Sequence, residues 1–157
     1  MRGGMTQKKK TWDKMSRYIR LRDAMEYCRT MGVSLHQFNR PEDVIGQCCT
    51  CGVVKSWIRM DAGHCISRGS GGMSGVYFDE RNVALQCKRC NGFEQGRRSE
   101  FEKYLTTKYG DGIMDELTIL DKTNSYKYKL EGLEMYYTQK YNELVAEFKE
   151  NKNERFN

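Results

Sequence analysis

The sequence predicts a mostly helical α+β protein in which a small zinc-stabilised module lies between N-terminal and C-terminal helices. Three features support this prediction. Apolar residues recur at helical spacing near both ends of the 157-residue chain, cysteines and glycines gather in its middle, and the chain has a single proline. With 38% hydrophobic and 31% charged residues, the length suits about one domain with a modest core.

The first two segments are an arm and a helix. Residues 1–10 are expected to form a disordered basic arm, because they are rich in lysine and contain no apolar pattern. Residues 11–46 are expected to hold an N-terminal helix, from about Thr11 to Thr30, followed by a connector. Apolar residues spaced by three and four positions favour that helix.

The module spans residues 47–98, and further helices fill residues 99–157. Short apolar pieces separated by turns give the module little core of its own, so it needs a metal. A capping box at Ser99 predicts one later helix, and Asp111 predicts the cap of another. A last helix should run to about Glu150, and its apolar stripe favours packing or a dimer interface. The stripe consists of Tyr126, Leu130, Leu133, Tyr137, Leu144 and Phe148.

The cysteines favour a metal site over disulfides. The sequence has no run of about 18 apolar residues and no signal peptide, so we expect a cytoplasmic protein without a membrane span. Disulfides are disfavoured in that reducing compartment. Cys48 and Cys51 form one CxxC pair, Cys87 and Cys90 form another, and together they have the spacing of a structural zinc site. Of the remaining cysteines, Cys28 and Cys65 are expected to be buried small apolar residues.

Positive charge is concentrated near the N-terminus. The chain carries a net charge of +6, and residues 1–22 contain eight Lys or Arg against Asp13 alone. This pattern suits the phosphate backbone of DNA, although a charge run can also be a solvated surface. The candidate DNA-binding residues are Lys8, Lys9, Lys10, Arg17, Arg20, Arg22, Arg68, Lys88, Arg89, Arg97 and Arg98.

His64 is the candidate catalytic residue between the two cysteine pairs. A neutral imidazole can accept a proton from water near neutral pH, which suits a general base in phosphodiester hydrolysis. The order of a histidine, a glycine-rich loop, "RNVALQC" and "CKRCN" resembles the HNH, or ββα-metal, nuclease motif. That resemblance implies His64, Asn82 and Asn91 as its three positions. Asparagine in the last position is similar to the endonuclease VII type, which implies a role for Glu94 as well.

A longer resemblance covers roughly residues 11–117. The segments "WDKMSRYIRLRDA", "CCTCG", "DAGHCISRG", "NVALQCKRCNGFEQG" and "YLTTKYGDG" look like those of the phage NinG/Rap recombination endonucleases. The resemblance implies cleavage of branched DNA, such as Holliday junctions and D-loops, with a divalent ion. The alternative is a DNA-binding accessory protein with the same zinc site and no catalytic activity.

The sequence departs from the endonuclease VII type at one position. Those sites carry an aspartate directly before the histidine, where this chain has Gly63. Asp61 lies on the same side of an extended strand and is our candidate for the missing carboxylate. Asp61 and Asn91 would then bind catalytic magnesium or manganese, while Asn82 would orient His64.

The same residues also have ordinary structural interpretations. Asn91 and Glu94 can form a helix cap, Asn82 can be a turn residue, and Asp61 can be a surface carboxylate. Since resolving a junction takes two cuts, a twofold homodimer is the expected assembly.

Overall fold

The structure is a computed structural model that describes residues 4–67, 73–93 and 97–154. Within them it is mostly helical, with two small antiparallel sheets, which confirms the α+β prediction. The helices are α1 (Gln7–Met31), α2 (Arg98–Tyr109), α3 (Ile113–Thr123) and α4 (Leu130–Asn153). The strands are β1 (Ile45–Gln47), β2 (Val54–Ser56), β3 (Asp61–His64) and β4 (Val83–Gln86). β1 pairs with β2, and β3 pairs with β4.

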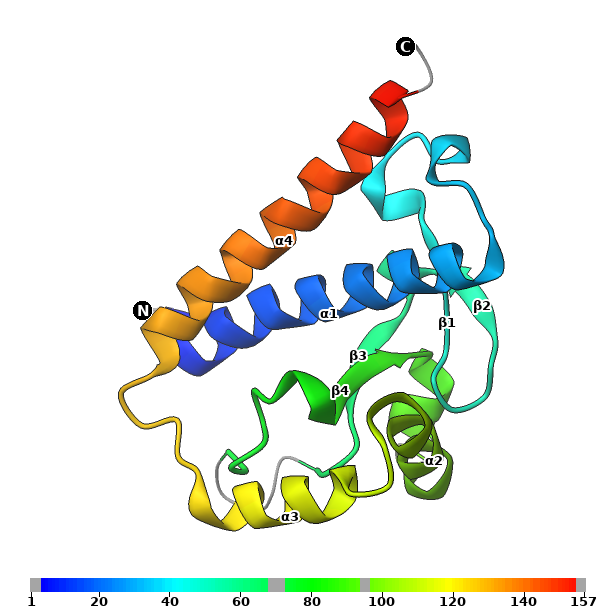
Figure 1. Cartoon of the computed structure of the whole chain (residues 1–157). Helices are drawn as coiled ribbons and strands as arrows, with labels where there is room; N and C mark the ends of the chain where they lie inside the picture. The colour runs from blue at the N-terminus through cyan, green and yellow to red at the C-terminus, as the bar shows by residue number, and fades with distance from the viewer. Residues whose placement is uncertain (1–3, 68–72, 94–96, 155–157) are drawn as a thin grey trace.

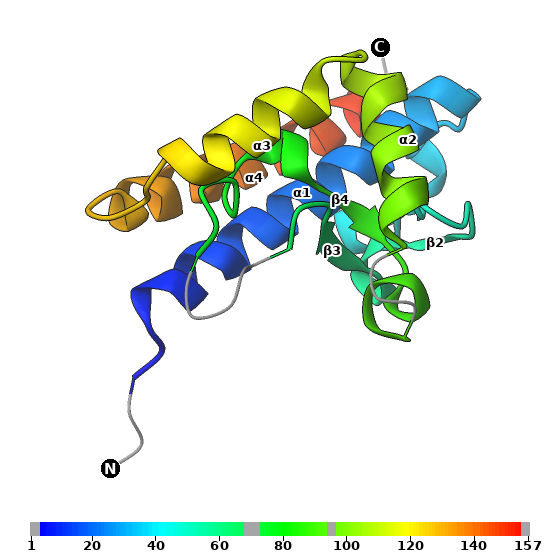
Figure 2. The same cartoon turned by 90° about the horizontal axis from the view of Figure 1, so that it is seen from below.

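Helix α1 lies at the centre of the fold (Figure 1). On one side it packs along α4, and the two run in the same direction: Gln7 bonds to Glu134 near their starts and Arg29 to Glu147 near their ends. On its other side α1 contacts the strands. Helices α2 and α3 cover the opposite face of the β3–β4 hairpin from α1, as the rotated view also shows (Figure 2).

Helix α1 begins earlier than the sequence predicted. Its first residue is Gln7, so residues 7–10 are helical and the prediction of a disordered arm is wrong for them. The reason is a local cap, in which the Thr6 side chain accepts a hydrogen bond from the backbone N–H of Lys9. At the other end Gly32 adopts the left-handed conformation, with φ 68°, that ends many helices.

The predicted caps of the later helices are not formed. Helix α2 begins after Arg97, which has φ 47° and makes no side-chain cap bond, so Ser99 lies inside the helix. Helix α3 begins after Gly112, one residue beyond the predicted cap at Asp111. Both helices place buried apolar residues against the hairpin, and this packing outweighs the local capping signal.

The apolar stripe of the last helix packs inside the chain. Tyr137 and Phe148 are 2% exposed and belong to two apolar clusters shared with α1. In this structure α1 covers the stripe, so packing within the chain accounts for it. The homodimer itself stays a prediction.

A buried carboxylate connects the two halves of the fold. Asp23 of α1 accepts a hydrogen bond of 2.9 Å from the backbone N–H of Leu85 in β4, and its other oxygen pairs with Arg22. The Lys108 ammonium of α2 lies 3.7 Å from the same carboxylate. Because burying a charge is costly unless it is paired, these partners fix the position of β4 against α1.

Candidate functional site

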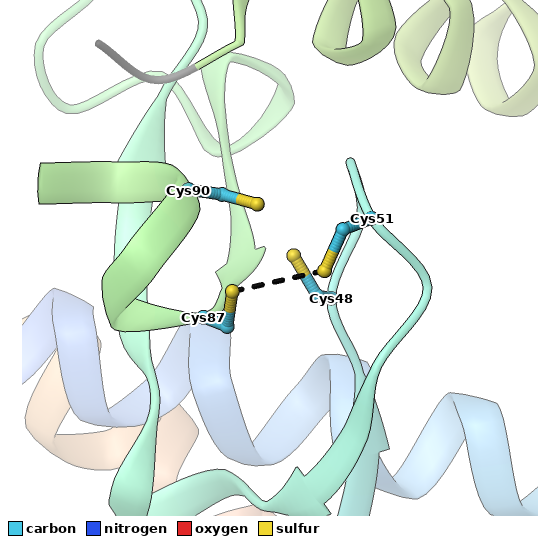
Figure 3. Close-up of side chains that lie close together, drawn as sticks. All are labelled: Cys48, Cys51, Cys87 and Cys90. Atoms are coloured by element: carbon cyan, nitrogen blue, oxygen red, sulfur yellow. Dashed lines mark hydrogen bonds between the residues drawn. The ribbon is translucent and has the colours of Figure 1, made fainter. Parts of the chain in front are cut away.

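Four cysteines converge at the base of the β3–β4 hairpin (Figure 3). Cys48 and Cys51 lie in the turn between β1 and β2, while Cys87 and Cys90 follow β4 and enter the π-helical turn η5 (Arg89–Phe93). All four sulfurs lie within 4.8 Å of one another. The two CxxC pairs thus meet as predicted, and the cluster can hold a metal ion such as zinc.

One pair of sulfurs has the spacing of a tetrahedral zinc site. Zn–S bonds of about 2.3 Å place the sulfurs of a tetrahedral site about 3.8 Å apart. The sulfurs of Cys51 and Cys87 are separated by 3.7 Å. Burial opposes ionisation of Cys48, but hydrogen bonds from nearby backbone groups outweigh it and lower its pKa to about 6. Burial and the neighbouring thiols raise the pKa of Cys51 to about 12, as expected when a second anion must share the cluster without a cation.

The other three cysteines are separate from this cluster. Cys28 and Cys65 are buried, which confirms their prediction as small apolar residues. Burial raises the pKa of Cys65 to about 11 and also raises the pKa of Cys28 and Cys49. Cys49 packs beside the apolar cluster under α2 and α3, so Cys48 is the residue that joins Cys51 in the four-cysteine cluster.

The β3–β4 hairpin sorts the candidate residues onto two faces. Asp61 pairs with Gln86 and Gly63 with Ala84, so these four share one face. Ala62 and His64 lie on the other face, which packs toward α1. The two faces meet at the edge of β3. A bound group could therefore reach both His64 and the face of position 63 only at that edge.

A polar pocket of about 210 Å³ lies at that edge. Asp61 and Asn91 both line it, and the Asn91 amide donates a hydrogen bond of 3.1 Å to an Asp61 carboxylate oxygen. The other Asp61 oxygen accepts a bond of 2.8 Å from Lys88. The Asp61 carboxylate, a ligand that suits a hard cation such as magnesium, thus lies between the Asn91 amide nitrogen and the Lys88 ammonium.

Arg20 closes the α1 side of this pocket. Its guanidinium bonds to the carbonyl of Met60 and lies 5.1 Å from the centre of the Trp57 ring. Burial lowers the pKa of Arg20, and the nearby Asp61 carboxylate opposes that change by favouring the charged form. A fixed cation therefore faces the polar pocket.

His64 packs against two aromatic rings, Trp12 and Tyr77, which also contact each other. Its ring stacks on Trp12, with centroids 4.6 Å apart, and its Nε2 bonds to the Tyr77 carbonyl oxygen at 3.0 Å. Since a carbonyl only accepts, Nε2 carries the proton, and Nδ1 is the nitrogen that can accept another. Trp12 also lines the polar pocket, so one side chain joins the histidine to the Asp61–Asn91 pair.

Asn82 holds both ends of the glycine-rich loop. It is fully buried; its Oδ1 accepts from the N–H of Ile66, and its Nδ2 donates to the carbonyls of Ile66 and Val76. Val76 precedes Tyr77, whose carbonyl bonds to His64. The structure thus places Asn82 where it fixes the backbone around the histidine.

Replacing Asn82 by alanine should destabilise the protein strongly. The change leaves one N–H and two carbonyl groups without their partner, which costs on the order of 3 kcal/mol and lowers the melting temperature by roughly 10 °C. Calorimetry or circular dichroism measures the shift. The exposed Asn142 of α4 gives the control, and an equal melting temperature for Asn142→Ala and Asn82→Ala would contradict the assigned role.

The candidate DNA-binding residues divide into three groups. Lys9, Lys10, Arg17, Lys88, Arg89 and Arg98 are exposed, and Lys8 and Arg97 are partly so. Arg22 is partly exposed and pairs with the carboxylates of Asp23 and Glu80, so its contact with DNA stays a prediction. Arg68 lies outside the described residues, as does the candidate catalytic residue Glu94.

Three residues near the site were not predicted from the sequence. Trp12 was assigned only to the apolar side of a helix, and Gln86 and Thr50 were not assigned. Gln86 is fully buried and its amide donates to the Thr50 hydroxyl at 3.2 Å. A polar residue inside the apolar run "NVALQC" was the one available signal.

Comparisons with known proteins agree on one family. The family model described as "Bacteriophage Lambda NinG protein" matches residues 4–154. "Protein ninG" of Escherichia phage 933W is 31% identical over 84 residues, and "Protein ninG" of Salmonella phage P22 is also 31% identical over 84 residues. These segments cover 54% of this chain and 40% of each relative, so the matched part is less than half of the relatives' length.

No solved structure shows a significant match to the chain. Among residues 4–67, 73–93 and 97–154, no helix is long and apolar enough to cross a membrane. Because the family model matches nearly the whole described chain, the chain belongs to the phage NinG family.

Proposed function

We propose that this chain is a metal-dependent endonuclease that cuts branched DNA during phage recombination. The observation that carries the proposal is the contact between Asp61 and Asn91 in a polar pocket next to the cysteine cluster. The order of β3, β4 and the turn η5 supports a ββα-metal core. The resemblance of the sequence to HNH nucleases supplies the reaction class.

The polar pocket has the ligands that a divalent cation prefers. Magnesium or manganese bound there would polarise the scissile phosphate and stabilise the leaving oxygen. Asp61 and Asn91 would hold the ion. The exposed pair between Lys88 and Asp61 is worth at most about 1 kcal/mol, so Lys88 can leave the carboxylate and contact a phosphate instead.

His64 would act as the general base. With its proton on Nε2 fixed by the Tyr77 carbonyl, the ring presents Nδ1 as the proton acceptor for the attacking water. Stacking on Trp12 holds the ring in place, which lowers the cost of orienting it for reaction. Asn82 would support this arrangement through the loop backbone.

Basic side chains around the pocket would position the DNA backbone. Arg20 lines the pocket, and Arg17 lies one helical turn before it on α1. Lys88 is exposed just before the turn η5, Arg89 is exposed at its first residue, and Arg98 is exposed at the start of α2. Such contacts hold the duplex without selecting a base sequence.

A second candidate function is a DNA-binding accessory role without cleavage. Gly63 favours it, since the endonuclease VII-type sites that the chain resembles carry an aspartate there. The cysteine cluster and the basic surface would serve binding alone in that case.

An incision assay separates the two functions. A labelled four-way junction and a linear duplex are incubated with the protein and magnesium, with or without chelator. We expect magnesium-dependent incision of the junction, reduced at least a hundredfold in Asp61→Asn because that variant loses a metal ligand. Binding of the junction should be retained, because every basic side chain is still present. Binding without incision by the native chain would support the accessory role.

The expected assembly is a homodimer, because a junction needs a cut in each of two strands. Light scattering at micromolar concentration measures the mass, and a monomer both free and on the junction would contradict this part of the proposal.

A further inference from the structure

Gly63 has no room for a side chain. A Cβ at this position would overlap Oε1 of Gln86 and lie 3.0 Å from its Cδ, closer than non-bonded atoms approach. Gly63 is not among the residues with positive φ, so the backbone conformation does not demand glycine. A side chain at position 63 would have to displace the Gln86 carboxamide from this space.

Gln86 lies between the polar pocket and the cysteine cluster. The same Cβ position would be 3.2 Å from Oδ1 of Asn91, so the side-chain amides of Gln86 and Asn91 flank one point. On the other side, the Gln86 amide donates to the Thr50 hydroxyl at 3.2 Å, and that hydroxyl lies 3.3 Å from the sulfur of Cys48. Hydrogen bonds thus connect a candidate zinc ligand to Gln86, and the Gln86 oxygen faces the same point above Gly63 as the oxygen of a candidate magnesium ligand.

We propose that Gln86 is a positioning residue that couples the four-cysteine cluster to the Asp61–Asn91 pair, with Gly63 providing the space it needs. This inference rests on the proposed function, because it assigns Asp61 and Asn91 to a divalent ion. Gln86 is 0% exposed, so it acts through Asn91 and does not touch the substrate. A buried amide costs free energy that an apolar side chain of equal size would avoid, which favours a polar role.

The steric part is tested by thermal unfolding of three variants. Gly63→Ala should lower the melting temperature, because its methyl group meets Gln86. Adding Gln86→Ala should remove the overlap, so the double variant should melt higher than the sum of the two single effects predicts. Additive losses would overturn the assigned contact.

The coupling is tested by manganese affinity, measured by electron paramagnetic resonance on the zinc-loaded protein. Gln86→Met keeps the side-chain volume and Thr50→Val keeps the shape, yet each should weaken manganese binding by about tenfold, as changes beside metal ligands do. The double variant should bind no more weakly than Gln86→Met alone. Zinc content should stay unchanged, and the exposed Thr118→Val of α3 should bind like the native chain.

The outcomes separate this inference from the proposed function. Manganese binding that is lost in Asp61→Asn but unchanged in Gln86→Met and Thr50→Val would overturn the coupling and leave the proposed metal site standing. No manganese binding by the native chain would overturn both the metal site and the coupling.

Discussion

Replacing His64 by alanine should reduce the rate of junction incision by about 10²–10⁴-fold, the usual contribution of a general base. Binding of the junction should persist, because the basic side chains of α1 and η5 are unchanged. The rate constant is measured in single turnover with excess protein. The native rate should depend on pH through its general base, and the variant should lose that dependence.

The other histidine supplies the control for this experiment. His36 lies in a 3-10 turn (Leu35–Gln37) away from the polar pocket, so His36→Ala should keep the native rate and pH profile. The stacking of His64 on Trp12 contributes only about 1 kcal/mol, so the His64→Ala protein should stay folded. Its melting curve checks that any loss of activity does not come from unfolding. Native-like incision by a folded His64→Ala protein would refute the assignment.

Removing the zinc ligands should unfold the region around the hairpin. Structural zinc contributes on the order of 10 kcal/mol in small sites, which is comparable to the whole stability of a domain of this size. Cys87→Ser or a strong chelator should therefore abolish cooperative unfolding, measured by the fluorescence of Trp57, which is buried against the same apolar cluster as Cys87.

Metal analysis gives the complementary result. The native chain should contain about one zinc per molecule, and Cys87→Ser should contain much less. Cys65→Ala is the matched control, since Cys65 is buried apart from the cluster. Equal zinc contents in the two variants would exclude the proposed ligand set.

The features that depend on local residue spacing, namely the cysteine cluster and the helices, could be predicted from the sequence. The two CxxC pairs specified the cysteine cluster because each pair is a short turn, and the helices followed from apolar periodicity. Asp61 was selected by strand alternation, and the structure places it against Asn91.

Other features depend on tertiary contacts that no local pattern records. An apolar stripe indicates that one face of a helix is buried, but it does not identify the element that covers this face. Tyr137 and Phe148 were therefore also compatible with a dimer interface, although they pack on α1. The stacking of Trp12 on His64 joins residues 52 positions apart in the sequence. The fit of Gln86 over Gly63 needs the register of β3 and β4, which only the folded hairpin provides.

The central claim is that Asp61 and Asn91 bind a divalent ion beside the cysteine cluster. Anomalous diffraction from crystals grown with manganese tests it most directly. The account predicts two peaks, one among the four sulfurs and one at roughly 2.0–2.3 Å from side-chain oxygens of Asp61 and Asn91. A manganese peak elsewhere, with water alone between these two side chains, would contradict it.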